Sequence, residues 1–319
     1  MTSIGDYIHA ATRDNTRRSY RAAVSHFEVE WGGFLPATVD SIVRYLAEHA
    51  ETLAHSTLRQ RLSAIGQWHL DQGFPDPTKA PVVRKVLRGI RELHPQKEKQ
   101  AKPLQLKALE LAVAWLGEQR TIARDERRFT DLLRHTRDQA LLLIGFWRGF
   151  RSDELIRLRI ERIDAVAGEG MTIHLPRTKT DRGLKGTTYK TPALSRLCPV
   201  SAYLDWVAVS GLASGPVFRA IDRWGKVSEE EINPGSVIPL LRRILSSAGV
   251  PNVTDYSSHS LRRGFATWAN ANGWELRTLM DYVGWKNAAS ASRYVDTPDP
   301  YNRELLERLV PPVGTQVDV

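Results

Sequence analysis

The chain is poor in the residues and segments that mark several classes of protein. It has a single cysteine, Cys198, in 319 residues, which excludes an internal disulfide framework and fits a reducing compartment. No stretch approaches the eighteen consecutive apolar residues of a transmembrane helix, and the N-terminus MTSIGDYIHAATRD lacks the charged start and apolar middle of a signal peptide. We therefore expect a cytoplasmic protein that neither spans a membrane nor is secreted.

Two kinds of binding site also lack their usual sequence signatures. The single cysteine and the scattered histidines show no spacing typical of a zinc site. The chain has no glycine-rich phosphate loop of the nucleotide-binding kind and no internal repeat. The sequence therefore predicts no bound metal and no other cofactor.

Positive charge and apolar content are what the chain does have. The formal net charge is +9, and 42% of the residues are hydrophobic. A chain of this length and apolar content can bury sizeable cores, and two domains are more typical of it than one. The excess of Arg and Lys favours a polyanionic partner such as nucleic acid.

The apolar periodicity of the first 95 residues predicts four helices, at 15–31, 38–50, 56–73 and 80–93. On three of them the face opposite the apolar stripe is cationic. These faces carry Arg17, Arg18 and Arg21, then Arg59 and Arg61, then Arg84, Lys85, Arg88 and Arg91. Several basic helices in one unit could follow the continuous row of phosphates on a DNA duplex.

The stretch HPQKEKQAKPL, with two prolines and a cluster of lysines, breaks this periodicity and predicts a linker. We expect an N-terminal helical domain at 10–96, the linker at 97–103 and a C-terminal domain at 104–319. In the second domain the patterns predict helices at 104–119, 128–147 and 151–164, a β-hairpin at 171–193, and mostly helix beyond.

Four separated motifs stand out in the second domain: RGFRSDEL (148–155), RTKT (177–180), HSLRR (259–263) and GWKNAASASRY (284–294). Their order and spacing resemble those of the tyrosine recombinase (phage integrase) family, above all its two-domain, Cre-like members. The resemblance covers essentially the whole chain. It implies a mainly α fold: an all-α core-binding domain and a mostly helical catalytic domain with a small antiparallel β-sheet, together a C-shaped clamp around DNA.

The chemistry implied by this resemblance explains why arginines are needed. When a side-chain oxygen attacks a phosphodiester, negative charge gathers on the non-bridging oxygens and on the leaving sugar oxygen. Arg151 and Arg262 match the family's catalytic arginines and would clamp the scissile phosphate. Glu154, three residues after Arg151 on the same helical face, can orient its guanidinium. His259, at a predicted helix start, can donate a hydrogen bond to a phosphate oxygen.

The resemblance also assigns the nucleophile and the proton donor. Tyr294 would attack the phosphorus, which leaves a 3′-phosphotyrosine link and a free 5′-hydroxyl, so that rejoining needs neither metal nor ATP. Lys179 fits the general acid that protonates the leaving oxygen, with Lys185 in the same hairpin as the rival. Trp285 stands where many members have His, and because an indole cannot transfer a proton here, acid and base work moves towards Lys179 and His259.

Binding residues and partners follow in the same way. Carried over by position, the groove or backbone contacts are Arg17, Arg18, Ser56, Thr57, Gln60 and Arg61, and Lys286 could contact a phosphate. The resemblance implies double-stranded DNA with a specific, inverted-repeat target site. It further implies a homotetramer on two duplexes, in which a terminal helix at about 301–310 docks into the neighbouring protomer.

Three other functions are weighed from the residues alone. A non-enzymatic, sequence-specific DNA-binding regulator could use the same basic helices, but it would not need an ordered Arg, Lys, His, Arg, Trp and Tyr set. A metal-dependent transposase would need a carboxylate triad, and no acidic set is placed convincingly for one. A type IB topoisomerase shares the bond chemistry, but the helical N-terminal unit fits a recombinase better.

Overall fold

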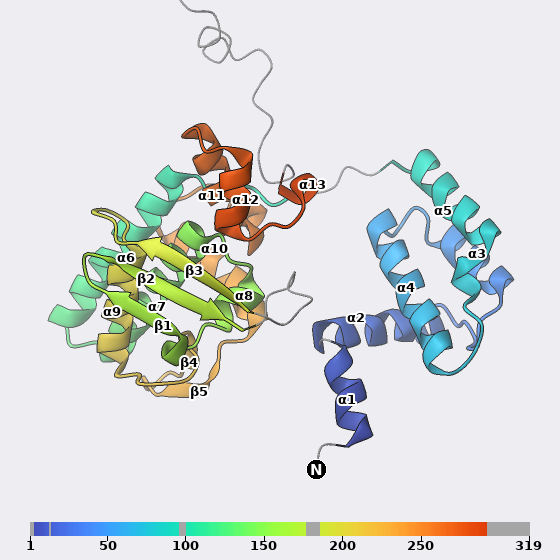
Figure 1. Ribbon diagram of the computed structural model, residues 1–319, viewed down its shortest axis with the longest axis horizontal. Helices are drawn as coiled ribbons and strands as arrows, with labels where there is room; N and C mark the ends of the chain where they lie inside the picture. Colours follow the sequence, from blue (N-terminus) through green and yellow to red (C-terminus); the bar gives the residue numbers. More distant parts are fainter. Residues whose placement is uncertain (1–2, 13, 96–99, 177–185, 292–319) are drawn as a thin grey trace, which may run out of the picture. The chain divides into compact units, whose positions relative to one another are not determined.

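The computed structural model describes residues 3–12, 14–95, 100–176 and 186–291. The chain divides into two compact units, Met1–Lys99 and Gln100–Val319, each with its own hydrophobic core (Figure 1). In the described ranges no helix is both long and apolar enough to cross a membrane.

The first unit is all-helical. Its elements are α1 (Ile4–Ala11), α2 (Asp14–Ser25), the π-helical η1 (His26–Glu30), α3 (Val39–Glu48), α4 (His55–Asp71), the 3₁₀ turn η2 (Pro77–Lys79) and α5 (Pro81–Leu93). The four predicted helices are present, whereas α1 was not predicted. α2 packs against α4, and α3 packs against α5. Their apolar stripes meet in a core that includes Phe27, Ile42, Leu46, Leu58 and Ile65.

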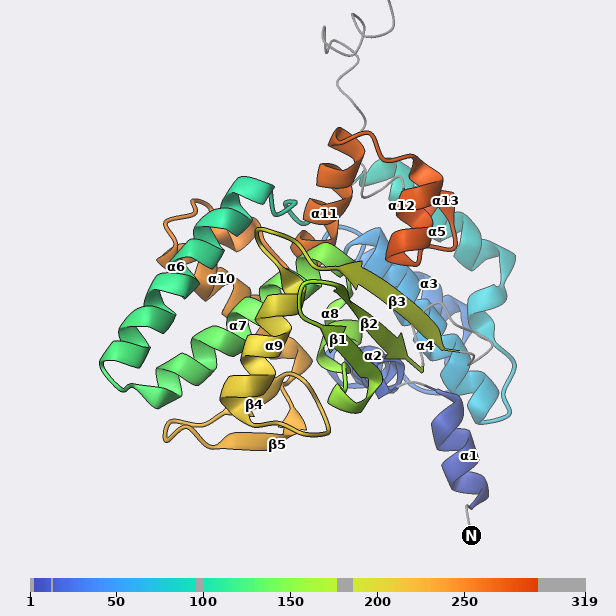
Figure 2. The same ribbon diagram turned by 60° about the vertical axis from the view of Figure 1, so that its left-hand side comes forward.

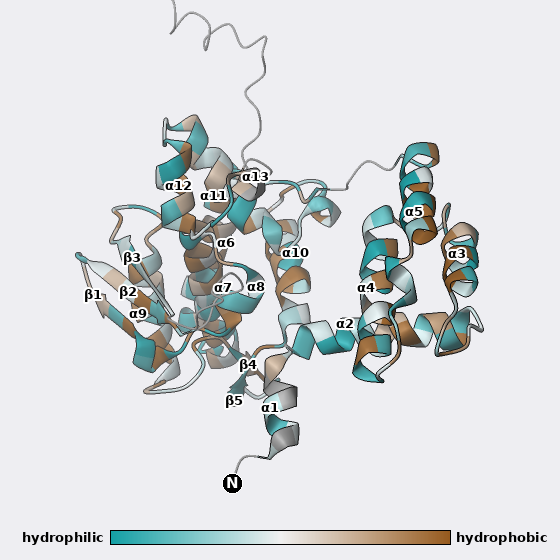
Figure 3. Cartoon of the chain, turned by 45° about the vertical axis from the view of Figure 1, so that its right-hand side comes forward, coloured by the Kyte–Doolittle hydropathy of each residue, from teal (hydrophilic) through white to brown (hydrophobic). Residues whose placement is uncertain are grey.

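Helices also build most of the second unit. They are α6 (Leu106–Asp125), α7 (Phe129–Arg148), α8 (Ser152–Ile156), α9 (Pro199–Ser210), α10 (Val237–Ser247), α11 (His259–Ala271), α12 (Leu276–Val283) and α13 (Ala288–Ala291), with 3₁₀ turns η3 (Ile160–Arg162), η4 (Pro234–Ser236) and η5 (Val253–Asp255). α7 is buried along most of its length because it packs against α6, α9 and α11. Figure 3 shows the hydrophobic colour concentrated on α6 and α7 inside this unit.

Two small antiparallel sheets complete the second unit. β1 (Ile163–Val166), β2 (Gly170–Leu175) and β3 (Thr187–Pro192) pair in that order, and β4 (Arg219–Ile221) pairs with β5 (Val227–Glu231). Alternate residues of β2 and β3 are buried, among them Ile173 and its partner Tyr189. β1 and β3 contact α9, and β3 also contacts the end of α7 (Figure 2). The predicted fold class, mainly α with a small antiparallel sheet, is confirmed.

The helix predicted at 151–164 is too long. α8 ends at Ile156, and the chain then enters η3 and β1. The backbone beyond α8 pairs with a distant segment instead of with itself: the Val217 amide donates to the Leu158 carbonyl at 2.8 Å, and the Ile160 amide donates to the Gly215 carbonyl at 3.0 Å. Tertiary pairing therefore overrides the local helical pattern.

Residues 100–104 are bound to the second unit at the start of α11. The Leu104 amide donates to the Ser260 carbonyl at 2.9 Å, and the Lys102 amide donates to the Asp255 carbonyl at 3.1 Å. Gly264 makes this approach possible, because a Cβ at that position would lie 2.0 Å from the Leu104 carbonyl oxygen. A backbone oxygen cannot move aside as the end of a flexible side chain can.

We expect Gly264→Ala to destabilise the protein by about 2–3 kcal/mol, since the added methyl must push residues 100–104 off α11. Gly117→Ala is the matched control, because Gly117 lies inside α6 and an added Cβ there would have no atom of another segment within 4 Å. There we expect a gain of about 0.5–1 kcal/mol from helix propensity. Urea unfolding of both full-length variants checks this, and equal midpoints would show that the contact at Gly264 is not needed.

Candidate active site

Arg151 and Glu154 form the ion pair that their spacing predicts. Arg151 precedes α8 in an extended conformation, and its Nη1 donates to Glu154 Oε1 at 2.6 Å. The backbone amide of Arg151 donates to Glu154 Oε2 at 3.0 Å, so the carboxylate also caps the start of the helix. Glu154 is 4% exposed and Arg151 is 19% exposed, so the guanidinium is held by a buried carboxylate while part of it reaches the surface.

Arg262 comes to the same carboxylate from α11. Its Nη1 lies 4.0 Å from Glu154 Oε2 and donates to the Gly149 carbonyl at 2.6 Å. Its Cζ lies 4.9 Å from the ring centre of Trp285, within range of a cation–π contact. Glu154 therefore stands between the two predicted phosphate-binding arginines. Two guanidinium groups around one carboxylate leave this cluster with net positive charge.

The end of α7 brings these groups together. Gly149 ends the helix in the left-handed conformation, with φ 56°. A Cβ at Gly149 would lie 3.3 Å from Val283 and 3.6 Å from Arg262, so glycine is required both by the backbone and by the close approach of α12 and α11. The Gly149 carbonyl accepts the hydrogen bond of Arg262, and Arg151 follows only two residues later, so this turn brings the two arginines together.

His259 and Lys286 are exposed, whereas Trp285 is 5% exposed and belongs to the core of the second unit. His259 is the first residue of α11, and its backbone amide donates to Ser257 Oγ at 3.2 Å. Because it lies three residues before Arg262, the two share one face of the helix. Trp285 follows the glycine that ends α12, and its backbone amide donates to the Met280 carbonyl at 2.8 Å.

Three predicted residues lie outside the described part of the chain: Tyr294, Lys179 and its rival Lys185. The described residues therefore hold the proposed phosphate-binding part of the site, and the assigned nucleophile and general acid stay predictions.

Sequence reasoning missed two residues beside this cluster, Arg148 and Tyr189. Burial raises the pKa of the Tyr189 phenol, the negative charge of Glu154 raises it further, and Arg148, Arg262 and Arg151 oppose the rise. The hydroxyl borders Gly284, where an added Cβ would lie 3.1 Å from it. The sequence did hold a signal for Arg148, because it is the only charged residue in the run LLLIGFWRGF. The pattern of β3 held no comparable signal for Tyr189.

Comparison with known proteins identifies the family of the chain. Residues 125–299, more than half of the chain, match the phage integrase family. The chain belongs to this family. The membership confirms the resemblance based on the four motifs and, with it, the predicted enzyme class, a tyrosine-type site-specific DNA recombinase of the Cre-like type.

Curated relatives extend over most of the chain. It is 26% identical over 312 residues to an integrase/recombinase XerD homolog of Selenomonas ruminantium, which covers 95% of this chain and 87% of the relative. It is also 26% identical over 294 residues to the recombinase Cre of Escherichia phage P1, and this alignment covers 88% of this chain and 82% of the relative.

Solved structures show the likeness of fold. A post-cleavage complex of the XerH site-specific recombinase bound to a palindromic difH substrate has a TM-score of 0.61 at 16% identity, over 92% of this chain and 78% of that one. A Tn1549 transposon integrase in complex with a circular intermediate DNA has a TM-score of 0.59 at 14% identity, over 93% of this chain and 94% of that one.

The predicted DNA contacts of the first unit differ in their freedom to bind. Arg18 and Ser56 are exposed, and Thr57 is half-buried. Gln60 donates to Ser19 Oγ at 2.8 Å. Arg17 forms an ion pair with Asp14 and donates to the Thr12 carbonyl.

Arg61 points into a polar cluster between α4, α3 and η1. Its Nη1 donates to Tyr45 Oη at 2.9 Å and lies 2.6 Å from His26 Nδ1. The His26 ring also lies 5.1 Å from the His49 ring and 3.5 Å from the Glu30 carboxylate. Burial lowers the pKa of His26, the positive charges of Arg61 and His49 lower it further, and Glu30 opposes them.

This cluster predicts that the protein loses stability in mild acid. The pKa of His26 is lower in the folded state than the ordinary value of 6.5, so its contribution is complete above that value and declines as the pH falls below it. We expect the melting temperature of the wild type to fall between pH 7.5 and 5.5, and to fall less in His26→Gln. If the melting temperatures of the two proteins fall equally over this pH range, His26 does not couple protonation to folding.

Proposed function

We propose that this recombinase cuts DNA by attack of Tyr294 on a phosphate held by Arg151 and Arg262, and rejoins it by the reverse attack of a 5′-hydroxyl. The observation that carries the proposal is the shared carboxylate: Glu154 lies 2.6 Å from one guanidinium and 4.0 Å from the other. A buried carboxylate that contacts two arginines, in an enzyme of this family, supports a site for a phosphodiester anion.

Charge stabilisation is the role that this geometry supports for the arginines. In the transition state, negative charge grows on the non-bridging oxygens as the bond from the Tyr294 oxygen to phosphorus forms and the bond to the 5′-oxygen breaks. Each guanidinium donor is worth about 3–4 kcal/mol, by comparison with single oxyanion donors in other enzymes. Arginine suits this task because it stays protonated and offers a planar fork of donors.

Proton transfer needs other groups. The phenol of Tyr294 must lose a proton as it attacks, and the 5′-oxygen must gain one as it leaves. We assign the second transfer to Lys179, with Lys185 as the alternative. Trp285 can donate a hydrogen bond but cannot transfer a proton here. Our candidate for accepting the proton of the Tyr294 phenol is therefore His259, which is exposed at the start of α11.

Arg262 has to become accessible for this reaction. Its side chain is 1% exposed, against 19% for Arg151. A phosphate could therefore contact Arg151 first and Arg262 only after neighbouring side chains move aside. Such a step would delay assembly of the site until DNA is bound.

On the DNA side, we propose that the first unit and Lys286 supply backbone and groove contacts at a specific target, in which two inverted half-sites each bind one protomer. In this proposal four protomers join two duplexes, and a helix at about 301–310, outside the described residues, links neighbours. The setting that this function implies is the bacterial cytoplasm, where a protein of bacterial or phage origin would associate with the nucleoid and act on DNA of a mobile element.

Trapping of the covalent intermediate tests the proposed reaction. A target is first selected from random-sequence duplexes by binding to the full-length protein, and is then nicked beside the cleavage point so that the released fragment diffuses away. We expect a protein–DNA complex on a denaturing gel with EDTA present, and a phosphotyrosyl peptide that contains Tyr294. Specific binding without a covalent complex would favour the DNA-binding regulator, and loss of activity in EDTA would favour a metal-dependent transposase.

A further inference from the structure

Arg148, the last residue of α7, ties three elements of the second unit together. It is 2% exposed. Its Nη1 donates to the Lys190 carbonyl in β3 at 3.0 Å, and its Nη2 donates to the Tyr282 carbonyl in α12. The guanidinium also lies over the Tyr282 ring, 3.8 Å from its centre, and 4.9 Å from the centre of the Tyr189 ring. One side chain therefore fixes the end of α7 against β3 and α12.

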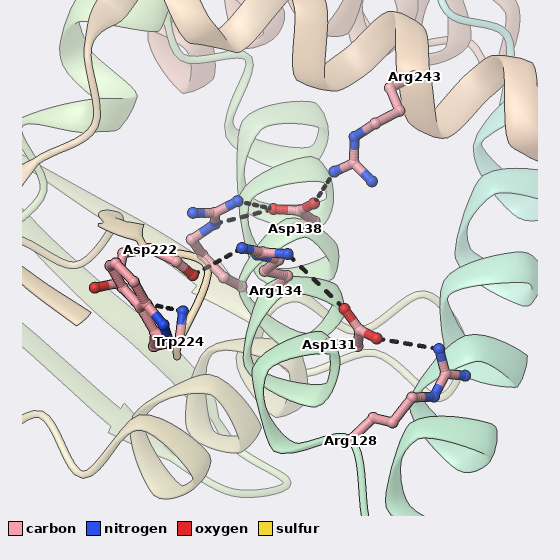
Figure 4. A network of polar contacts seen from close by, with 8 residues as sticks. Arg128, Asp131, Arg134, Asp138, Asp222, Trp224 and Arg243 are labelled. Atoms are coloured by element: carbon pink, nitrogen blue, oxygen red, sulfur yellow. Dashed lines mark hydrogen bonds and ion pairs between the residues drawn. The ribbon is translucent and has the colours of Figure 1, made fainter. Parts of the chain in front are cut away.

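The charge of Arg148 is buried without a carboxylate. No ion pair joins it to an acidic residue in the described part of the chain, and burial lowers its pKa. Arg137, another buried arginine of α7, is paired differently. Its Nη2 donates to Asp138 at 2.7 Å. Asp138 also accepts from Arg243 of α10 at 2.7 Å, a contact that Figure 4 shows. Carbonyls and aromatic faces stabilise a guanidinium less than a carboxylate does, so stability alone is a weak reason for an arginine at position 148.

The contacts of Arg148 surround the arginine cluster of the active site. The next residue, Gly149, accepts the hydrogen bond of Arg262 at 2.6 Å. Tyr282 lies three residues before Trp285, whose ring packs against the Arg262 guanidinium. If the fork of Arg148 were lost, the Gly149 carbonyl, the end of α12 and β3 could shift relative to one another, and Arg262 and Trp285 would shift with them.

We propose that Arg148 is a positioning residue for DNA cleavage: it holds the backbone segments that place Arg262 and Trp285 against the scissile phosphate. We assign it no contact with DNA, because both of its Nη atoms already donate to backbone carbonyls. Its uncompensated positive charge also adds to the field that a phosphate meets at the cluster. The inference rests on the proposed function and extends it to Arg148, which begins the motif RGFRSDEL but is not among the residues that the family resemblance assigns to catalysis.

Arg148→Lys tests the proposal, since it keeps the charge but replaces the fork, in which each Nη reaches a different carbonyl, by a single ammonium nitrogen. Full-length protein is assayed on the selected, nicked duplex, with affinity measured separately from the rate of covalent complex formation at saturating DNA. We expect the dissociation constant to stay within about twofold of the wild type and the cleavage rate to fall by at least about 30-fold, because the variant disturbs the transition state and not DNA binding. An unchanged cleavage rate in a folded variant would overturn the proposal.

Arg137→Lys is the matched control, because Arg137 is also buried on α7 but lies eleven residues away, about 16 Å along the helix. We expect it to lower the melting temperature and to leave the cleavage rate of folded protein within about threefold of the wild type. If both variants lose cleavage in proportion to their loss of stability, Arg148 is merely structural and the proposal fails.

Tyr282→Leu decides the case if Arg148→Lys does not fold. It removes the aromatic face over Arg148 and leaves the hydrogen bond to the backbone carbonyl in place. We expect a smaller loss of cleavage rate, again with unchanged affinity, and a wild-type rate would overturn the proposal. A wild-type protein that forms no covalent complex would overturn the proposed function itself, and the two failures are thereby distinguished.

Discussion

Tyr294→Phe is expected to form no covalent complex with DNA, a loss of at least about 10⁴-fold in the rate of cleavage. The variant lacks only the oxygen that would form the bond to phosphorus, so the proposed covalent link cannot form at this position. DNA binding should stay within about twofold of the wild type, because one hydroxyl adds little to the many phosphate contacts of such an interface. The measurement is the denaturing-gel assay on nicked DNA with EDTA present.

Tyr7→Phe is the control for this result. Tyr7 lies exposed on α1 in the first unit, and its substitution removes the same hydroxyl from a site that we assign to no step. It should cleave as the wild type does. Covalent complex formed by Tyr294→Phe would show that another side chain attacks, and peptide mapping of that complex would identify it.

The sequence predicts well those features that depend on residues close together along the chain. The long helices α7 and α11 follow from apolar periodicity, and the Arg151–Glu154 pair follows from a spacing of three residues on one helix face. The β-hairpin of β2 and β3 follows from strict alternation on both sides of a turn. Each of these depends on local geometry that a sequence pattern records directly.

Features that depend on distant segments were not predictable in the same way. The end of α8 at Ile156 is decided by pairing with residues 215–217. β1 and the β4–β5 hairpin were missed for another reason, since both pair locally: β1 begins inside the segment predicted as helix, and β4–β5 has an irregular register. The contact between Glu154 and Arg262 joins residues 108 positions apart, so the motifs predicted its members but not the shared carboxylate. The role of Arg61 was also incompletely predicted: the helix pattern places it on a DNA-binding face, but its side chain hydrogen-bonds to Tyr45 inside its own unit.

Arg262→Gln is expected to slow cleavage by about 10²–10³-fold, the loss typical of one oxyanion donor. Glutamine is shorter than arginine and removes the positive charge, but it retains an N–H donor that can face the Gly149 carbonyl. Glu154 then faces Arg151 alone, and the cluster loses the excess positive charge that would attract a phosphate. The cleavage rate at saturating DNA and the affinity are measured separately on the selected duplex.

A substrate with a methylphosphonate at the scissile position separates two explanations of that loss. Replacing one non-bridging oxygen by a methyl group removes the negative charge that a guanidinium would neutralise, so an arginine that acts through charge becomes dispensable there. We therefore expect the defect of Arg262→Gln to shrink to about tenfold or less on this DNA. Arg263→Ala controls for loss of a neighbouring buried arginine, which contacts Gln100 Oε1 at 2.6 Å, and its rate should change equally little on both substrates. If Arg262→Gln is as slow on methylphosphonate as on the natural diester, Arg262 serves the packing of α11 against Gly149, and the charge on the phosphate must be met by other residues.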